Sequence, residues 1–118
     1  MMTPRPQLRH RMANGRIYDP SAGDKKKFLN KFKEKWDNAP MSRVSLLRLT
    51  FRFKLLKSHK KKHVAGDLYL QTPDVDNLCK YLMDALNGVA WVDDRFIGRI
   101  MAEKVYAQED SVTIEIYN

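Results

Sequence analysis

Four carboxylates and a lysine lie close together in the second half of the chain, at Asp74, Asp76, Lys80 and Asp93-Asp94. Carboxylates that gather at one place repel each other unless a cation lies between them. A hard divalent ion such as Mg²⁺ removes this cost and prefers oxygen ligands. Such an ion can polarise a phosphoryl oxygen and help to generate a hydroxide nucleophile, and a nearby lysine can stabilise the developing charge. These residue types therefore suit metal-assisted hydrolysis of a phosphodiester.

A helix that we expect over residues 76–86 arranges several of these side chains in a row. At 100° per residue, Asp76, Lys80 and Asp84 project from one narrow edge of this helix. Asp74 lies just before its first turn. The side that we expect to face the core is apolar and consists of Leu78, Tyr81, Leu82, Ala85, Leu86 and Val89.

Each of these features also has a simpler explanation. Asp74 could be only a helix cap, since negative charge at a helix N-terminus complements the helix dipole. Asp76 and Lys80 could form a surface ion pair worth about 0.3–0.5 kcal/mol. Asp93-Asp94 could belong to an ordinary turn. All three explanations would have to hold together, in a chain whose other half contains little acid.

The charge of the chain is strongly segregated. The 118 residues carry a net charge of +8. Residues 1–62 hold 18 Lys and Arg against 4 Asp and Glu, whereas residues 63–118 hold 4 against 10. We interpret the basic half as a surface that collects a polyanion such as nucleic acid, and the acidic half as having a separate task. The candidate phosphate contacts are Arg5, Arg9, Arg11, Arg16, Lys25, Lys26, Lys27, Lys60, Lys61 and Lys62.

Length and composition predict one globular domain over residues 1–118. The chain is 43% hydrophobic and 31% charged, which excludes wholesale disorder. No window approaches the roughly 18 uninterrupted apolar residues of a membrane span, and we expect no secretory leader. The single cysteine, Cys79, excludes an internal disulfide and a cysteine-based zinc site. We therefore expect a cytoplasmic protein.

The pattern of apolar and polar residues predicts an α+β fold, with a mixed sheet of about four to five strands and two main helices. The first 20 residues, rich in Pro and Arg, suit an irregular segment or an edge strand. The strand near the middle of the chain alternates apolar with basic side chains. Besides the helix at 76–86, we expect a helix that begins within residues 21–24 and ends at about residue 36. The expected strands are 44–55, 67–70, 98–106 and 112–117. Residues 57–63 are expected to form an exposed loop.

The acidic motif resembles that of the RusA-like endodeoxyribonucleases, small Holliday-junction resolvases of bacteria and their phages. The family's central signature is D-x-D-N-x-x-K-x-x-x-D-A-L, followed about ten residues later by D-D. The chain reads Asp74-Val75-Asp76-Asn77-Leu78-Cys79-Lys80-Tyr81-Leu82-Met83-Asp84-Ala85-Leu86 and then Trp91-Val92-Asp93-Asp94. Pro4-Arg5-Pro6 and Gly15-Arg16-Ile17-Tyr18-Asp19-Pro20 are similar to the Pro/Arg start and the G-R-x-Y segment common in that family.

This resemblance implies a homodimer with one acidic site per subunit, which introduces paired nicks into a four-way DNA junction with Mg²⁺. Mn²⁺ is expected to substitute for Mg²⁺, and neither a membrane nor a small-molecule cofactor is expected. Asp74, Asp76 and Asp94 match the metal-binding aspartates, and Lys80 matches the essential lysine. Asp93 matches the first of the paired aspartates, as a ligand or as a support for one. The compartment would be the bacterial cytoplasm, or that of the host cell if a phage encodes the chain.

The chain departs from the family after the aspartate pair, where Arg95-Phe96 replaces a small polar residue and Gln. A cleavage-sequence preference therefore does not carry over, and Phe96 becomes a further candidate DNA contact. We expect Asp84 to hold Lys80 or a nearby backbone group. We expect Cys79 to be a small packed residue, Met83 to lie in the core or at a dimer contact, and Trp36 and Trp91 to lie in the core rather than to stack on bases. The histidines are expected to contact solvent or phosphate rather than a metal: His10, His59 and His63.

The alternative function is a DNA-binding module of the same fold, non-catalytic or differently selective, for branched or flap DNA. A mere binder has no need for the full acidic set together with Lys80, so these residues favour the nuclease. An RNA-binding accessory protein is a third possibility, but the chain contains no RNP1-type aromatic motif.

Overall fold

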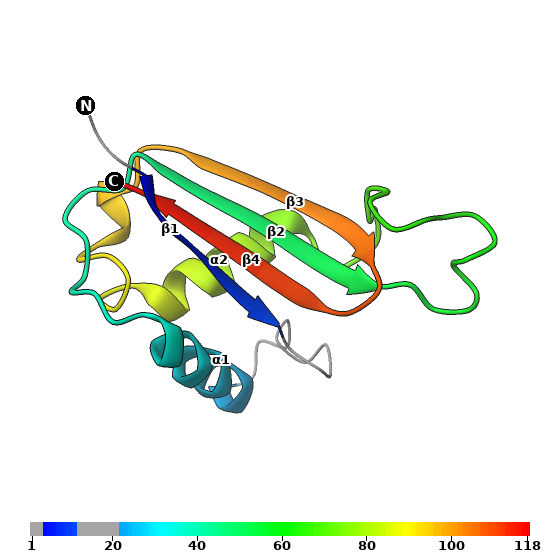
Figure 1. The fold of residues 1–118 in the computed structure, drawn as a ribbon, viewed down its shortest axis with the longest axis horizontal. Coiled ribbons are helices and arrows are strands. Elements are labelled where there is room, and N and C mark those ends of the chain that lie inside the picture. Colours follow the sequence, from blue (N-terminus) through cyan, green and yellow to red (C-terminus); the bar gives the residue numbers. More distant parts are fainter. Residues whose placement is uncertain (1–3, 12–21) are drawn as a thin grey trace.

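Four strands form a single mixed sheet in the computed structural model, which describes residues 4–11 and 22–118, with side chains from Lys26 onward. The strand order is β1-β4-β2-β3, with β2 parallel to β3 and antiparallel to β4, and β1 antiparallel to β4. Figure 1 shows α2 running behind this sheet. The elements in chain order are β1 (Pro4–Arg11), α1 (Ala22–Lys35), β2 (Leu46–Lys54), α2 (Val75–Leu86), the 3₁₀ helix η2 (Asp94–Phe96), β3 (Ile100–Ala107) and β4 (Ser111–Tyr117).

The core forms where the alternating strands meet the apolar sides of the two helices. Strand β2 turns its apolar residues inward and its polar residues outward, as period-two alternation requires. Trp91, which follows α2, is fully buried in the same cluster. The other members come from both helices and two strands, and include Phe28, Phe32, Leu47, Leu49, Phe51, Leu78, Leu82, Leu86, Val112, Ile114 and Ile116.

The predicted α+β class, the mixed sheet and the two main helices are confirmed. The sheet contains β1 and three further strands, β2, β3 and β4, which correspond to the strands predicted at 44–55, 98–106 and 112–117. Strand β1 lies at the sheet edge, one of the two forms expected for the Pro- and Arg-rich start.

The short strand predicted at 67–70 is wrong. Leu68 makes only an isolated bridge to Val105, on the open edge of β3. The last backbone hydrogen bond from this segment to β3 is the one that the Tyr69 N–H donates to the Lys104 carbonyl, at 2.9 Å. Beyond Tyr69 the chain bends away toward α2, so the pairing is too short to form a strand.

The connection from β2 to α2, residues 55–74, extends well beyond the end of the sheet (Figure 1). We call it the long loop. None of the helices among the described residues has the length and apolar character needed to cross a bilayer.

Candidate active site

Asp74 and Asp76 lie at the N-terminal end of α2. Asp74 occupies the N-cap position, but its side chain makes no capping hydrogen bond. Asp76 is exposed in the first turn, and within the described chain no ion pair joins it to Lys80. Asp74 thus has the cap position of the simpler explanation without a cap hydrogen bond, and Asp76 does not form the ion pair with Lys80. Both remain available for another partner.

The faces of α2 are those that the sequence predicts. Leu78, Leu82, Ala85 and Leu86 are buried against the sheet. The opposite edge, which consists of Asp76, Lys80 and Asp84, is exposed. No ion pair between Lys80 and Asp84 is present among the described residues, so the expected hold of Asp84 on Lys80 is not seen.

Local contacts fix the second acidic pair at η2. The Asp93 side chain caps η2 by accepting a hydrogen bond from the Arg95 backbone N–H, at 3.1 Å between Oδ1 and N. Asp94 Oδ1 accepts a hydrogen bond from the Trp91 indole Nε1–H at 2.6 Å. Because Trp91 is fully buried, this bond orients the Asp94 carboxylate from the core. Asp93 thus has the turn role of the simpler explanation, whereas Asp94 is held by a rigid side chain.

The two acidic groups lie at opposite ends of α2. The chain stays close to the C-terminal end after the helix, since the Ala90 N–H donates to the Leu86 carbonyl at 2.9 Å. Figure 1 shows η2, the small helix in yellow-orange, beyond this end. At about 1.5 Å per residue, the 12 residues of α2 separate its ends by about 18 Å. Accordingly, no three His, Cys, Asp or Glu residues among those described are grouped so as to hold a metal ion.

The donors nevertheless fit Mg²⁺ in their chemistry. Asp74, Asp76 and Asp94 offer only carboxylate oxygens, which hard cations prefer. Mg²⁺ commonly keeps several waters and binds through one or two carboxylates together with substrate phosphates. The exposed pair at the start of α2 can supply such carboxylates within one chain, but Asp94 of the same chain cannot join them.

Cys79 lies on α2 between the acidic edge and the core, where it packs against the core cluster as expected. Burial and, to a smaller extent, the negative charge of Asp76 raise the pKa of the Cys79 thiol above its ordinary value. Both effects keep the sulfur protonated, so it behaves as a small packed residue. Met83 and Trp36 also pack against the core cluster.

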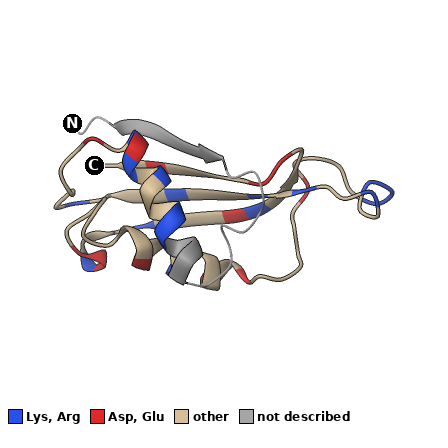
Figure 2. Ribbon diagram, turned by 90° about the horizontal axis from the view of Figure 1, so that it is seen from below, with Lys and Arg blue, Asp and Glu red and all other residues tan. Residues whose placement is uncertain are grey.

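The described basic side chains gather on the long loop and on α1. Lys60, Lys61 and Lys62 are exposed, and Figure 2 shows Lys and Arg at the far end of the long loop. Lys26 and Lys27 are exposed on α1. The remaining expected phosphate contacts lie outside the residues whose side chains are described: Arg5, Arg9, Arg11, Arg16 and Lys25.

The histidines of the long loop do not simply face solvent or phosphate, as was expected. The His63 ring stacks on the Tyr106 ring, with centroids 4.6 Å apart, and its Nδ1 lies 3.7 Å from Asp67 Oδ2. The His59 ring also contacts Tyr106, with centroids 5.2 Å apart. The reason is that Tyr106 offers a large aromatic face at the end of β3, against which the base of the long loop packs. His10 lies outside the residues whose side chains are described.

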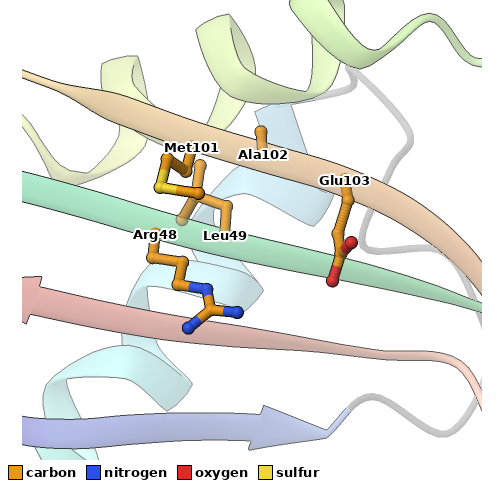
Figure 3. Close-up of a pocket in the computed structure, with 5 residues that line it drawn as sticks. All are labelled: Arg48, Leu49, Met101, Ala102 and Glu103. Atoms are coloured by element: carbon orange, nitrogen blue, oxygen red, sulfur yellow. The ribbon is translucent and has the colours of Figure 1, made fainter.

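A shallow pocket lies between β2 and β3, and none of the predicted aspartates of the site lines it. It is lined by Arg48, Leu49, Met101, Ala102 and Glu103 (Figure 3). Arg48 forms an ion pair with the partly buried Glu115 of β4, 3.7 Å away. The outer face of β2 is therefore less basic than its sequence suggests, and the pocket contains no predicted catalytic residue.

Sequence reasoning missed Lys104 of β3. Its Nζ donates hydrogen bonds to the carbonyls of Gln71 and Pro73, directly before Asp74. A signal was present in the alternation of β3, which turns Lys104 toward the core beside Phe51 of β2. A lysine at an inward position of a strand needs polar partners.

Comparison with known protein families shows to which family the chain belongs. The family described as Endodeoxyribonuclease RusA matches residues 1–117. The chain belongs to the RusA family of endodeoxyribonucleases. The resemblance that the acidic motif carried is thus confirmed over nearly the whole length. A comparison with curated proteins finds no match.

Proposed function

We propose that this RusA family chain is a Mg²⁺-dependent endonuclease that resolves four-way DNA junctions by paired phosphodiester hydrolysis. The family match carries the proposal. Two observations support it. The Asp74 carboxylate makes no cap hydrogen bond, and the exposed Asp76 carboxylate forms no ion pair with Lys80 among the described residues. Asp74, Asp76 and Asp94 would hold the metal, which when bound polarises a phosphoryl oxygen and activates water.

Lys80 would act on the scissile phosphate. It lies one helical turn after Asp76 on the exposed edge of α2, and its side chain is exposed. An ammonium at this place can donate hydrogen bonds to phosphate oxygens and stabilise the charge that develops on them. The Asp94 carboxylate that would join this site is already oriented by the Trp91 indole.

The distance between the acidic groups favours a homodimer that shares its sites. In a two-fold dimer, the start of α2 in one subunit can face η2 of the other, which brings Asp74 and Asp76 to the partner's Asp94. Apolar side chains border both groups, since Val75 is 39% and Val92 54% exposed. Two such sites would match the two-fold symmetry of a four-way junction, which needs two opposed nicks.

The first test is cleavage of a synthetic four-way junction with and without Mg²⁺. We expect the wild-type chain to cut only with the metal, and Asp76→Asn to abolish cutting while junction affinity stays equal or rises. Asp37→Asn, which removes an exposed carboxylate beyond α1, is the matched control and should cut normally. Retained cleavage by purified Asp76→Asn would overturn the site assignment. Junction binding without any cutting by the wild type would favour the non-catalytic binding module.

The second test asks whether the sites are shared between subunits. Asp76→Asn and Asp94→Asn are each expected to be inactive alone. In a mixed dimer with shared sites, one site combines the intact Asp76 of one subunit with the intact Asp94 of the other, so nicking returns. If each site lies within one chain, every site in the mixture has one defect and no activity returns.

A further inference from the structure

We propose that Lys104 of β3 is a positioning residue for the acidic end of α2, an inference that rests on the proposed metal site there. The Lys104 Nζ donates to the Gln71 carbonyl at 2.6 Å and to the Pro73 carbonyl at 2.7 Å. Pro73 directly precedes Asp74, the first of the expected ligands. One ammonium group on the sheet thereby holds both ends of the short segment 71–73 that leads into α2.

Tyr69 assists Lys104 in holding this segment. The Lys104 Nζ lies 5.5 Å from the centroid of the Tyr69 ring, a cation–π contact. The Tyr69 N–H donates to the Lys104 carbonyl at 2.9 Å, and the Tyr69 hydroxyl donates to the Thr72 carbonyl at 3.3 Å. Together the two side chains contact the carbonyls of three successive residues, 71–73. This segment is therefore fixed by Lys104 of β3 and by Tyr69 of the long loop.

The position of Asp74 depends on this anchorage. A capping residue is usually held by its own side-chain hydrogen bond to the first turn of the helix. Asp74 has no such bond. Its carbonyl accepts the Leu78 N–H at 3.1 Å, and the segment before Asp74 supplies the rest of its backbone support. A half-buried ammonium that bonds two carbonyls is a strong anchor, since charge-assisted hydrogen bonds are stronger than neutral ones. Without Lys104, we expect the segment to relax and the Asp74 carboxylate to move from its place beside Asp76.

The test replaces Lys104 with methionine, which keeps the length of the side chain and removes the donors. The matched control is Lys54→Met, which removes the same charge from an exposed position at the end of β2. We expect Lys104→Met to weaken Mn²⁺ binding without DNA, measured by electron paramagnetic resonance, by roughly 10–100-fold, as for residues that support metal ligands. The Mg²⁺ concentration for half-maximal cleavage should rise in parallel, while the rate at saturating Mg²⁺ and the junction affinity stay within about two-fold. Lys54→Met should bind Mn²⁺ as the wild type does.

Hydrogen exchange gives a readout that does not need a metal. In Lys104→Met, a peptide covering residues 70–78 should exchange faster, whereas one covering residues 82–90 should be unchanged. If the wild type binds no Mn²⁺ but this difference is seen, the proposed metal site fails while the anchoring role of Lys104 stands. A folded Lys104→Met chain with wild-type exchange at 70–78 and wild-type Mn²⁺ affinity would overturn the proposal. Should Lys104→Met not fold, Lys104→Leu, which also removes every donor, takes its place, and the same wild-type values in it would overturn the proposal equally.

Discussion

At the scale of single residues, hydrogen bonds separate the acidic side chains that the sequence treats alike. The Asp93 carboxylate is engaged by the Arg95 backbone, and Asp94 is oriented by the Trp91 indole. Asp74 occupies a cap position without making a cap bond. Because Asp93 and Asp94 each already accept one hydrogen bond, these contacts favour Asp74 as a ligand but do not separate Asp94 from Asp93. The role of Asp93 is then to shape η2 beside Asp94.

The alkylation of Cys79, which lies on α2 near Asp76, is predicted to depend on pH. Burial and the Asp76 charge both disfavour the thiolate, so they raise the pKa of the thiol. Alkylation of Cys79 by iodoacetamide, followed by mass spectrometry, should therefore show a midpoint at higher pH than a free cysteine. Asp76→Asn removes one of the two causes and should lower the midpoint, although burial keeps it above the free value. A wild-type midpoint at or below that of free cysteine would contradict the prediction.

Lys80 is predicted to act in the transition state rather than in ground-state binding. Lys80→Ala should lower the cleavage rate at saturating DNA by roughly 10²–10³-fold, the usual effect of removing one charge-stabilising donor. Junction affinity, measured by a mobility-shift titration, should change far less. Lys80→Arg is an unsafe control, because the guanidinium is broader and its charge is delocalised. A loss of affinity alone would make Lys80 an ordinary phosphate contact.

At the scale of elements, the sequence predicts structure well where the determinants are local. The apolar side of α2 and the alternation of β2 were both predicted from the sequence, because the backbone geometry fixes how often a side chain returns to the same face. The acidic residues proposed for the site were chosen by their types and spacing, and they stay a prediction. Their arrangement could not be predicted, because it depends on the path of the chain after Gly88. That glycine has a φ of 83° and turns the chain, but η2 stays beyond the end of α2.

Contacts between distant elements account for the rest of what the sequence does not reveal. Lys104 bonds Gln71 across 33 positions of the chain, and the stacking of His63 on Tyr106 likewise joins the long loop to β3. The alternation of β3 places Lys104 on the inner face of the sheet, but no local pattern in the sequence identifies Gln71 or Tyr106 as a partner. Such partners follow from the sheet topology, in which β3 lies beside β2 and leaves an open edge for the loop.

Trp91 is predicted to link stability and activity through the turn between α2 and η2. Trp91→Phe removes the indole donor to Asp94 and leaves a void in the core. We expect a loss of about 1–3 kcal/mol in the free energy of unfolding by denaturant titration, and reduced junction cleavage. Trp36→Phe is the matched control, because the half-buried Trp36 indole makes no hydrogen bond in the described structure. Cleavage by Trp91→Phe equal to that of Trp36→Phe would show that Asp94 needs no such orientation.

At the scale of the whole molecule, charge and shape are arranged for a large polyanionic partner. The long loop extends the basic surface beyond the sheet (Figure 2), while the acidic residues of α2 stay close to the body of the domain. Part of the positive charge on the sheet is neutralised internally, as in the Arg48–Glu115 pair. The long loop and α1 are therefore the described surfaces where we expect phosphate contacts.

The salt dependence of junction binding tests whether this basic surface is a DNA footprint. Each phosphate contact releases condensed counterions, so binding should weaken with salt at a log–log slope of roughly −0.9 per contact on duplex arms. A dimer making about six to ten contacts would lose roughly 10³–10⁵ in affinity between about 50 and 200 mM salt. Replacing Lys60, Lys61 and Lys62 together with Glu should lower affinity for all DNA shapes alike and flatten the slope, because phosphate contacts position the protein without reading sequence. Cleavage at saturating DNA should stay nearly unchanged, since the long loop holds these lysines away from the acidic residues. If affinity hardly responds to salt, the positive charge serves solubility alone, and DNA must bind through another surface.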